Sequence, residues 1–119
     1  MTEAVETPWG SYRVLDEGPR YKVKLLFVRP GASTSLQFHR HRQEMWTVVH
    51  GTADVRINEK QGQIHESAYA YIGRSEIHRL TNNGKIDLYV IEVQTGSYLG
   101  EDDIERLEDA YGRAKPIAR

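Results

Sequence analysis

The sequence predicts a single all-β domain folded as a sandwich or a barrel. Short segments rich in valine, isoleucine, threonine and aromatic residues recur along most of the chain, and turn residues separate them at near-regular spacing. Within residues 53–58 apolar and polar side chains alternate, as in a strand with one buried face. A length of 119 residues suits one domain with its own core. We therefore expect one domain over residues 1–119.

The predicted elements begin after a polar start. Residues 1–20 are broken by prolines and glycines, so we expect an N-terminal arm with turns. The barrel is expected over residues 21–95, with Pro30 and Gly31 ending its first strand. Residues 58–62 are expected to form a hairpin loop. The predicted strands are residues 21–29, 35–41, 44–49, 53–58, 67–72, 77–81 and 86–94.

The tail of the chain has a different period. Ile104, Leu107 and Tyr111 recur at helical spacing. Residues 101–103 are acidic and would lie in the first turn, where the helix dipole favours anions. We therefore expect a short C-terminal helix over residues 101–112.

Composition excludes several classes of function. The net charge of −1 provides no field for attracting nucleic acid or an anionic membrane, so neither is an expected partner. The chain has no cysteine, which excludes disulfides, a thiolate nucleophile and a cysteine-ligated zinc site. The N-terminus does not resemble a signal peptide, and no apolar run is long enough to span a bilayer. A cytoplasmic protein is expected.

The stretch from Gln37 to Glu44 is the most informative for function. On one strand Gln37, His39 and His41 would share a face, whereas Glu44 has the opposite parity and could join them only if the chain turns after His41. Together with His78, two imidazoles and a carboxylate suit a divalent metal such as zinc, manganese or iron. The alternative is a solvent-exposed strand, and Gln37 is either a ligand or a hydrogen-bond partner of one.

These motifs resemble those of the cupin superfamily. The first cupin motif is resembled by a set of five residues, namely Gly31, His39, His41, Glu44 and Gly51. The second is resembled by residues 73–78 together with Asn82. The wider pattern is similar to the type II mannose-6-phosphate isomerase domain, which is often fused behind a mannose-1-phosphate guanylyltransferase. This pattern is carried by residues 8–12, 35–42, 46–49, 51–53, 91–96, 98–104, 106 and 111–113.

The resemblance implies a double-stranded β-helix, or jelly-roll barrel, with a metal site inside it. Carried over onto this sequence, the ligand positions are His39, His41, Glu44 and His78, and Gln37 matches a glutamine of the isomerases. The implied cofactor is a divalent metal, with zinc expected first and manganese, iron or cobalt as alternatives. Small cupins commonly pair through N-terminal arms and outer sheet faces, so a homodimer is expected.

The implied activity is an aldose–ketose isomerisation between mannose 6-phosphate and fructose 6-phosphate through an enediol. A metal would polarise the sugar carbonyl, and a nearby base would carry the proton between two carbons. The sequence leaves three candidates for this base, which are Glu92 and, if either is released from the metal, Glu44 or His41.

The phosphate of the substrate requires cations. Arg42 and Arg106 are the expected pair because the resemblance includes both positions, and Lys24 is a further candidate. For each of them the alternative is an ordinary solvated charge. Two other functions remain open, namely a non-catalytic sugar-binding or regulatory cupin and an oxygenase-type cupin that uses iron.

Overall fold

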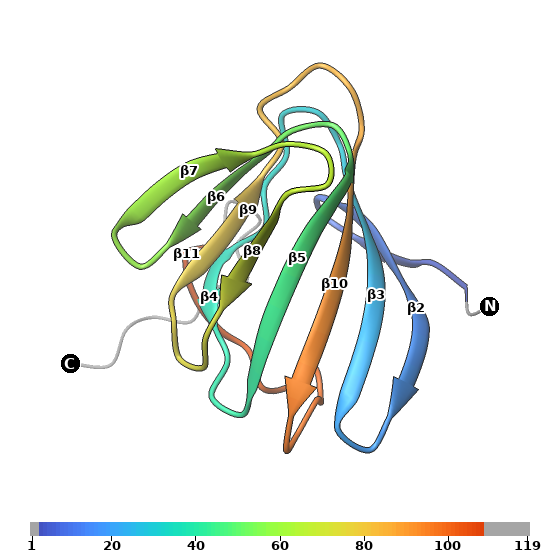
Figure 1. Cartoon of the computed structure of the whole chain (residues 1–119), viewed down its shortest axis with the longest axis vertical. Helices are drawn as coiled ribbons and strands as arrows, with labels where there is room; N and C mark the ends of the chain where they lie inside the picture. Colours follow the sequence, from blue (N-terminus) through green and yellow to red (C-terminus); the bar gives the residue numbers. More distant parts are fainter. Residues whose placement is uncertain (1–2, 109–119) are drawn as a thin grey trace.

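A computed structural model describes residues 3–108 and shows two β-sheets packed face to face (Figure 1). The six-stranded sheet has the order β1 (Val5–Thr7), β2 (Gly10–Gly18), β3 (Tyr21–Val28), β10 (Leu88–Gly96), β5 (Arg42–His50) and β8 (Tyr69–Ile72). The five-stranded sheet has the order β11 (Glu105–Glu108), β4 (Leu36–Phe38), β9 (His78–Thr81), β6 (Ala53–Ile57) and β7 (Lys60–Ile64). The predicted all-β fold is confirmed.

The two central strands of the six-stranded sheet determine what faces the interior. Along β5 and β10 every second side chain is buried, as the alternation of residues in these strands requires. At one end of β5 these buried positions are apolar, whereas at its beginning they are Arg42 and Glu44. On the neighbouring β10, Glu92 and Gln94 lie opposite Trp46 and Glu44. One end of the interior is therefore an apolar core, and the other is lined by charged and polar groups.

The apolar end holds the fold together. Its buried side chains come from both sheets, with Trp9 from the N-terminal segment added at one side. Their removal from water is the main favourable contribution to folding. The core residues are Trp9, Leu26, Val28, Trp46, Val48, Ala53, Val55, Ile72, Leu80, Leu88 and Val90.

The predicted C-terminal helix is wrong where the structure describes it. Residues 105–108 form strand β11, which pairs with β4. β4 would otherwise be the edge of its sheet, and the hydrogen bonds that β11 supplies to this edge outweigh the helical spacing of the tail. Residues 109–112 of the expected helix lie outside the described residues.

The N-terminal arm is more ordered than the sequence suggested. β1 and β2 form a hairpin, and β2 pairs along its length with β3. The arm therefore extends the six-stranded sheet, and Trp9 packs into the core of its own chain. β2 was concealed because its burial does not alternate: residues 11–14 are all partly buried, and residues 15–17 are all exposed.

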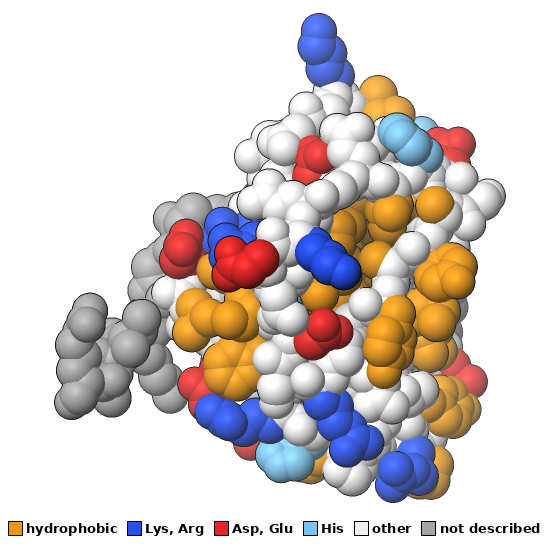
Figure 2. All heavy atoms as spheres, turned by 60° about the vertical axis from the view of Figure 1, so that its left-hand side comes forward, with side chains coloured by type: hydrophobic (Ala, Val, Ile, Leu, Met, Phe, Trp, Pro, Cys, Tyr) orange, Lys and Arg blue, Asp and Glu red, His pale blue; other side chains and the backbone are white. Residues whose placement is uncertain are grey.

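The outer surface also carries apolar side chains. Tyr69 and Tyr71 on the edge strand β8 are 63% and 55% exposed. Figure 2 shows hydrophobic side chains gathered on one side of the molecule, among scattered charged groups. No helix among the described residues has the length and hydrophobicity needed to cross a membrane.

Replacing Gly96 by alanine is expected to destabilise the protein by about 1–3 kcal/mol, because the new methyl group would overpack a tight strand contact. An added Cβ would lie 2.3 Å from the His41 carbonyl oxygen and 2.8 Å from the Arg42 Cα. The free energy of unfolding in urea measures the effect. The matched control is Gly62→Ala, where no atom lies within 4 Å of the added Cβ. An equal, small change in both variants would contradict this contact.

Candidate functional site

Three side chains that are distant in sequence converge at the polar end of the interior. His39 follows β4, Glu44 lies on β5, and His78 begins β9. The His39 Nε2 atom lies 3.2 Å from Glu44 Oε2, and the His78 Nε2 atom lies 3.9 Å from Glu44 Oε1. All three side chains are buried, and their ligand atoms lie within 4.8 Å of one another. This arrangement can hold a metal ion.

The hydrogen bonds of the two histidines fix which nitrogen faces Glu44. His39 Nδ1 lies 2.7 Å from the Asp103 carbonyl oxygen, and His78 Nδ1 lies 2.9 Å from the Glu76 carbonyl oxygen. A carbonyl oxygen only accepts, so each Nδ1 carries the proton that it donates. Each Nε2 therefore directs its lone pair toward the carboxylate, the tautomer that metal-binding histidines adopt when a carbonyl holds the other nitrogen. Two imidazole nitrogens with free lone pairs and a carboxylate form a donor set that fits a divalent metal.

The chain between β4 and β5 explains why His39 is inside and His41 is outside. The strand ends at Phe38, so the expectation that His39 and His41 share a strand face is wrong. Asp103 caps the turn, because its carboxylate accepts the backbone N–H groups of Arg40 and His41 at 3.0 and 2.9 Å. The His41 side chain is 56% exposed and pairs with Asp103. The structure therefore does not bring His41 together with the other three residues.

Gln37, which the sequence offered either as a metal ligand or as a hydrogen-bond partner of one, lies beside the three converging residues. It lies on β4 directly opposite His78 on β9, and residues paired in this way direct their side chains to the same face. Gln37 also lines the cavity that contains His39 and Glu44. The oxygen of its side-chain amide could serve as a fourth donor atom for a metal, beside those of His39, Glu44 and His78.

Two buried cations accompany these residues. Arg42 donates from Nε to Glu44 Oε2 at 2.9 Å and from Nη2 to His39 Nε2 at 3.3 Å. Lys24, on β3, donates to Glu101 Oε2 at 2.9 Å, and its Nζ lies 4.1 Å from the centre of the Tyr12 ring. Side chains of this length are rarely buried without a partner of opposite charge. Both cations belong to the candidate site.

Glu92 lies beside Glu44 on the neighbouring strand. Its Oε1 accepts a hydrogen bond from Trp46 Nε1 at 3.0 Å, and its Oε2 accepts one from Gln94 Nε2 at 2.8 Å. Trp46 Nε1 also lies 3.2 Å from Glu44 Oε1, so one indole bridges the two carboxyl groups. The tryptophan thus contributes to the core and also orients the acidic side chains.

The two carboxyl groups have opposite proton affinities. Burial acts to raise the pKa of Glu44, but its contacts with His39, His78 and Arg42 hold this pKa well below its usual value. Burial and the neighbouring Glu44 carboxylate raise the pKa of Glu92 to about 7, against the opposing charges of Lys24 and Arg42. Glu44 therefore stays ionised near neutral pH, whereas Glu92 can take up and release a proton.

Burial also decides the charge of His78. It lowers the pKa of this imidazole, although the Glu44 carboxylate acts in the opposite direction. At neutral pH the His78 ring is therefore uncharged, which is the form that binds a metal.

These groups open into a cavity of about 110 Å³ between the two sheets. Arg106, predicted from the sequence as a phosphate ligand, lines it from β11. Glu101 and Ile104 also line it, and they come from the segment for which the sequence suggested a helix. Other lining residues that the sequence did not single out for this site are Thr7, Trp9, Tyr12, Leu26, Thr34 and Ser35.

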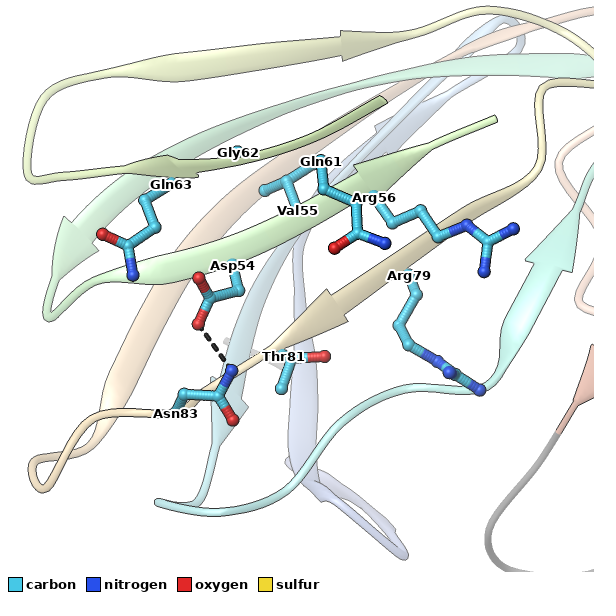
Figure 3. Close-up of a pocket in the computed structure, with 9 residues that line it drawn as sticks. All are labelled: Asp54, Val55, Arg56, Gln61, Gly62, Gln63, Arg79, Thr81 and Asn83. Carbon is cyan, nitrogen blue, oxygen red and sulfur yellow. Dashed lines mark hydrogen bonds between the residues drawn. The ribbon is translucent and has the colours of Figure 1, made fainter. Parts of the chain in front are cut away.

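A separate polar groove of about 420 Å³ lies on the outer face of the five-stranded sheet (Figure 3). Asp54 accepts a hydrogen bond from Asn83 at 2.7 Å, and the side chains of Arg56 and Arg79 extend away from this pair. Arg79 follows His78 on β9, so its side chain points to the opposite face of the sheet. The groove is thus separated from the candidate site by the sheet.

The free energy of unfolding of the metal-free protein is expected to depend on pH through Glu92. Its folded-state pKa is about 7 against an ordinary 4.5, so the folded state binds more protons than the unfolded state between these values. The contribution of Glu92 to the free energy of unfolding therefore falls as pH rises from about 4.5 to about 7, by about 3 kcal/mol at most. Urea unfolding at pH 5 and pH 8 tests this. Glu92→Gln should gain stability relative to the unsubstituted protein only at pH 8, and an equal difference at both pH values would contradict it.

Comparison with known proteins identifies the family of this chain. A family described as "Mannose-6-phosphate isomerase C-terminal" matches residues 1–109. The alginate biosynthesis protein AlgA of Pseudomonas aeruginosa is 57% identical over 92% of this chain, and a mannose-1-phosphate guanylyltransferase of Sinorhizobium fredii is 48% identical over 94%. The chain spans only 23% and 22% of those two proteins, or about a quarter of their length.

Solved structures support the fold. The cupin domain of Schizosaccharomyces pombe Cnp3 superposes with a TM-score of 0.69 at 15% identity, covering 72% of this chain and 64% of that one. KdgF from Halomonas superposes with a TM-score of 0.76 at 14% identity, covering 84% and 89%. The fold is that of a cupin, and the chain belongs to the mannose-6-phosphate isomerase C-terminal family.

Proposed function

We propose that this chain is a metal-dependent isomerase domain that interconverts mannose 6-phosphate and fructose 6-phosphate. The observation that carries the proposal is a single cavity that holds both kinds of group such a reaction needs. His39, Glu44 and His78 form a donor set for a metal, and Lys24 and Arg42 supply buried positive charge beside it. Membership of the isomerase family supports the same substrate.

The metal would be held by His39, Glu44 and His78, with Gln37 as a further donor. Imidazole and carboxylate donors suit zinc first, and manganese, iron or cobalt also accept them. When bound, the metal polarises the carbonyl of the open-chain sugar and stabilises the developing oxyanion.

Glu92 is the residue that we assign to proton transfer. It lines the cavity next to Glu44, and Trp46 and Gln94 hold both of its carboxyl oxygens. In the forward direction it takes the proton from C2 of mannose 6-phosphate and delivers a proton to C1. The hydroxyl proton of O2 moves to O1, so the aldehyde at C1 becomes a hydroxyl group and the carbonyl forms at C2. Glu44 is less suited to this step, because its lowered pKa makes its carboxylate a weak acceptor of a proton. A base whose pKa lies near neutral pH is the more effective proton carrier.

Lys24, Arg42 and Arg106 are assigned to the phosphate. Arginine can bind two phosphate oxygens at once, and lysine acts as a point charge. The buried charges of Lys24 and Arg42 are poorly screened by solvent, so they attract an anion more strongly than surface cations do.

The test is to load the protein with zinc, manganese, iron or cobalt and to follow fructose 6-phosphate formed from mannose 6-phosphate. Turnover that requires the metal supports the proposal. Binding of mannose 6-phosphate without turnover would favour a non-catalytic sugar-binding cupin. An iron-loaded protein that consumes oxygen and leaves the sugar unchanged would favour an oxygenase.

A further inference from the structure

Glu101 lies where three cations converge at the mouth of the cavity. Its Oε2 atom is 2.9 Å from Lys24 Nζ, 3.8 Å from Arg42 Nη1 and 4.0 Å from Lys22 Nζ. Lys24 and Arg42 are almost completely buried, with side chains 5% and 4% exposed. Arg42 also pairs with Glu44 at 2.9 Å and Lys22 with Glu17 at 3.8 Å, but Glu101 is the carboxylate that contacts all three cations. Its place could be taken by a more highly charged anion.

The Arg42 guanidinium is incompletely satisfied. Among the described residues its Nη1 atom is buried and has no hydrogen-bond partner, since Glu101 Oε2 at 3.8 Å is beyond hydrogen-bond length. A buried donor without a hydrogen-bond partner lowers the stability of the folded protein. A ligand with several acceptor oxygens could satisfy this donor and Lys24 together, which one carboxylate does not do here.

Glu101 itself is free to move away. Its side chain is 44% exposed, so the carboxylate can rotate into solvent without crossing the core. The backbone around it has separate anchors, because Lys22 donates to the Leu99 carbonyl oxygen at 3.2 Å and Asp103 caps the turn after β4. Displacing the carboxylate therefore does not require the segment to unfold.

We propose that Lys22, Lys24 and Arg42 form an anion subsite that the Glu101 carboxylate occupies, and that a phosphoryl group binds there by displacing Glu101. The inference rests on the proposed function, in which a sugar phosphate supplies the phosphoryl group. A phosphate ester carries about −1.5 to −2 charges near pH 7 and three acceptor oxygens. It therefore competes with a single carboxylate, whereas an uncharged sugar does not. Glu101 is on this account a residue that determines specificity for phosphorylated substrates.

Titration of the full chain with inorganic phosphate tests the inference. Metal is removed and the chelator dialysed away, so that phosphate cannot bind to a metal instead. Glu101→Gln should bind phosphate about 3–10-fold more tightly than the unsubstituted protein, because removing an internal competitor raises the fraction of open subsites. Lys24→Met should lose phosphate binding. The matched control is Glu59→Gln, which removes the same charge from an exposed turn and should leave the affinity unchanged.

Equal or weaker phosphate binding by Glu101→Gln would overturn the inference, as would a failure of every variant to bind phosphate. If Glu101→Gln does not fold, Glu101→Asp provides the same comparison, because the shorter side chain withdraws the carboxylate from Lys24 and should also tighten binding. The titration needs neither metal nor turnover. Tighter phosphate binding by Glu101→Gln without isomerisation would support the subsite and reject the proposed activity. Isomerisation without tighter phosphate binding would support the activity and reject the subsite.

Discussion

Replacing His78 by alanine is expected to abolish high-affinity metal binding. The Nε2 atom of His78 is one of three ligand atoms that converge within 4.8 Å, and its Nδ1–H is already committed to the Glu76 carbonyl oxygen. Loss of a hydrogen-bond partner of a ligand typically costs 10–100-fold in metal affinity, so loss of the ligand itself should cost more than about 100-fold. Equilibrium dialysis against zinc, followed by elemental analysis, measures the effect.

The control for this experiment is His65→Ala. His65 is exposed and contacts Thr52 Oγ1 at 3.2 Å, so its removal should leave one metal bound at the original affinity. Because His78 is buried, the far-ultraviolet circular dichroism of His78→Ala must also match that of the unsubstituted protein. A folded His78→Ala protein that keeps one tightly bound metal would contradict the proposed ligand set.

Replacing Glu92 by glutamine is expected to lower kcat by about 10²–10⁴-fold, the usual contribution of a positioned acid–base group. Glutamine keeps the size of the side chain and an oxygen that can accept from Trp46, but it cannot carry a proton. Metal content should remain near that of the unsubstituted protein, since Glu92 is not one of the three converging ligands. Steady-state kinetics with mannose 6-phosphate, together with metal analysis, separate the two effects.

Glu59→Gln again provides the matched control, because it makes the same chemical change in an exposed turn. A Glu92→Gln protein with kcat within about threefold of the original would reject Glu92 as the proton carrier, since a lost acid–base group costs far more than that. Among the remaining sequence candidates only Glu44 lines the cavity, so the base would then have to be Glu44.

The barrel could be predicted from the sequence because its central strands are half-buried or fully buried and show a period of two. The alternation in β6 and β10 is an example. Strands β1, β2, β7 and β11 escaped prediction, and β7 begins within the expected hairpin loop. Two of these strands show how pairing with a neighbouring strand decides the structure. β11 is a strand because β4 offers an unpaired edge, and β2 is a strand because it extends β3. The local sequence does not indicate which strands of the folded protein have an edge available for pairing.

Part of the site was also visible in the sequence. His39, Glu44 and His78 were expected together, and they lie together in the fold. His41 was expected with them but lies outside the group, because the direction of each side chain depends on where β4 ends. That end is stabilised by Asp103, which is 62 residues from His41 along the chain. The role of Glu101 was hidden for the same reason, since its cationic neighbours come from β3 and β5.

The most direct test of the account is to incubate the metal-loaded protein with mannose 6-phosphate in D₂O and to record proton and carbon NMR spectra. The account predicts that fructose 6-phosphate accumulates and that deuterium appears at its C1 position, because Glu92 exchanges its proton with solvent while the enediol is present. Mannose 6-phosphate recovered unchanged, with no deuterium at C2, would contradict the claim that this cavity isomerises a sugar phosphate by proton transfer.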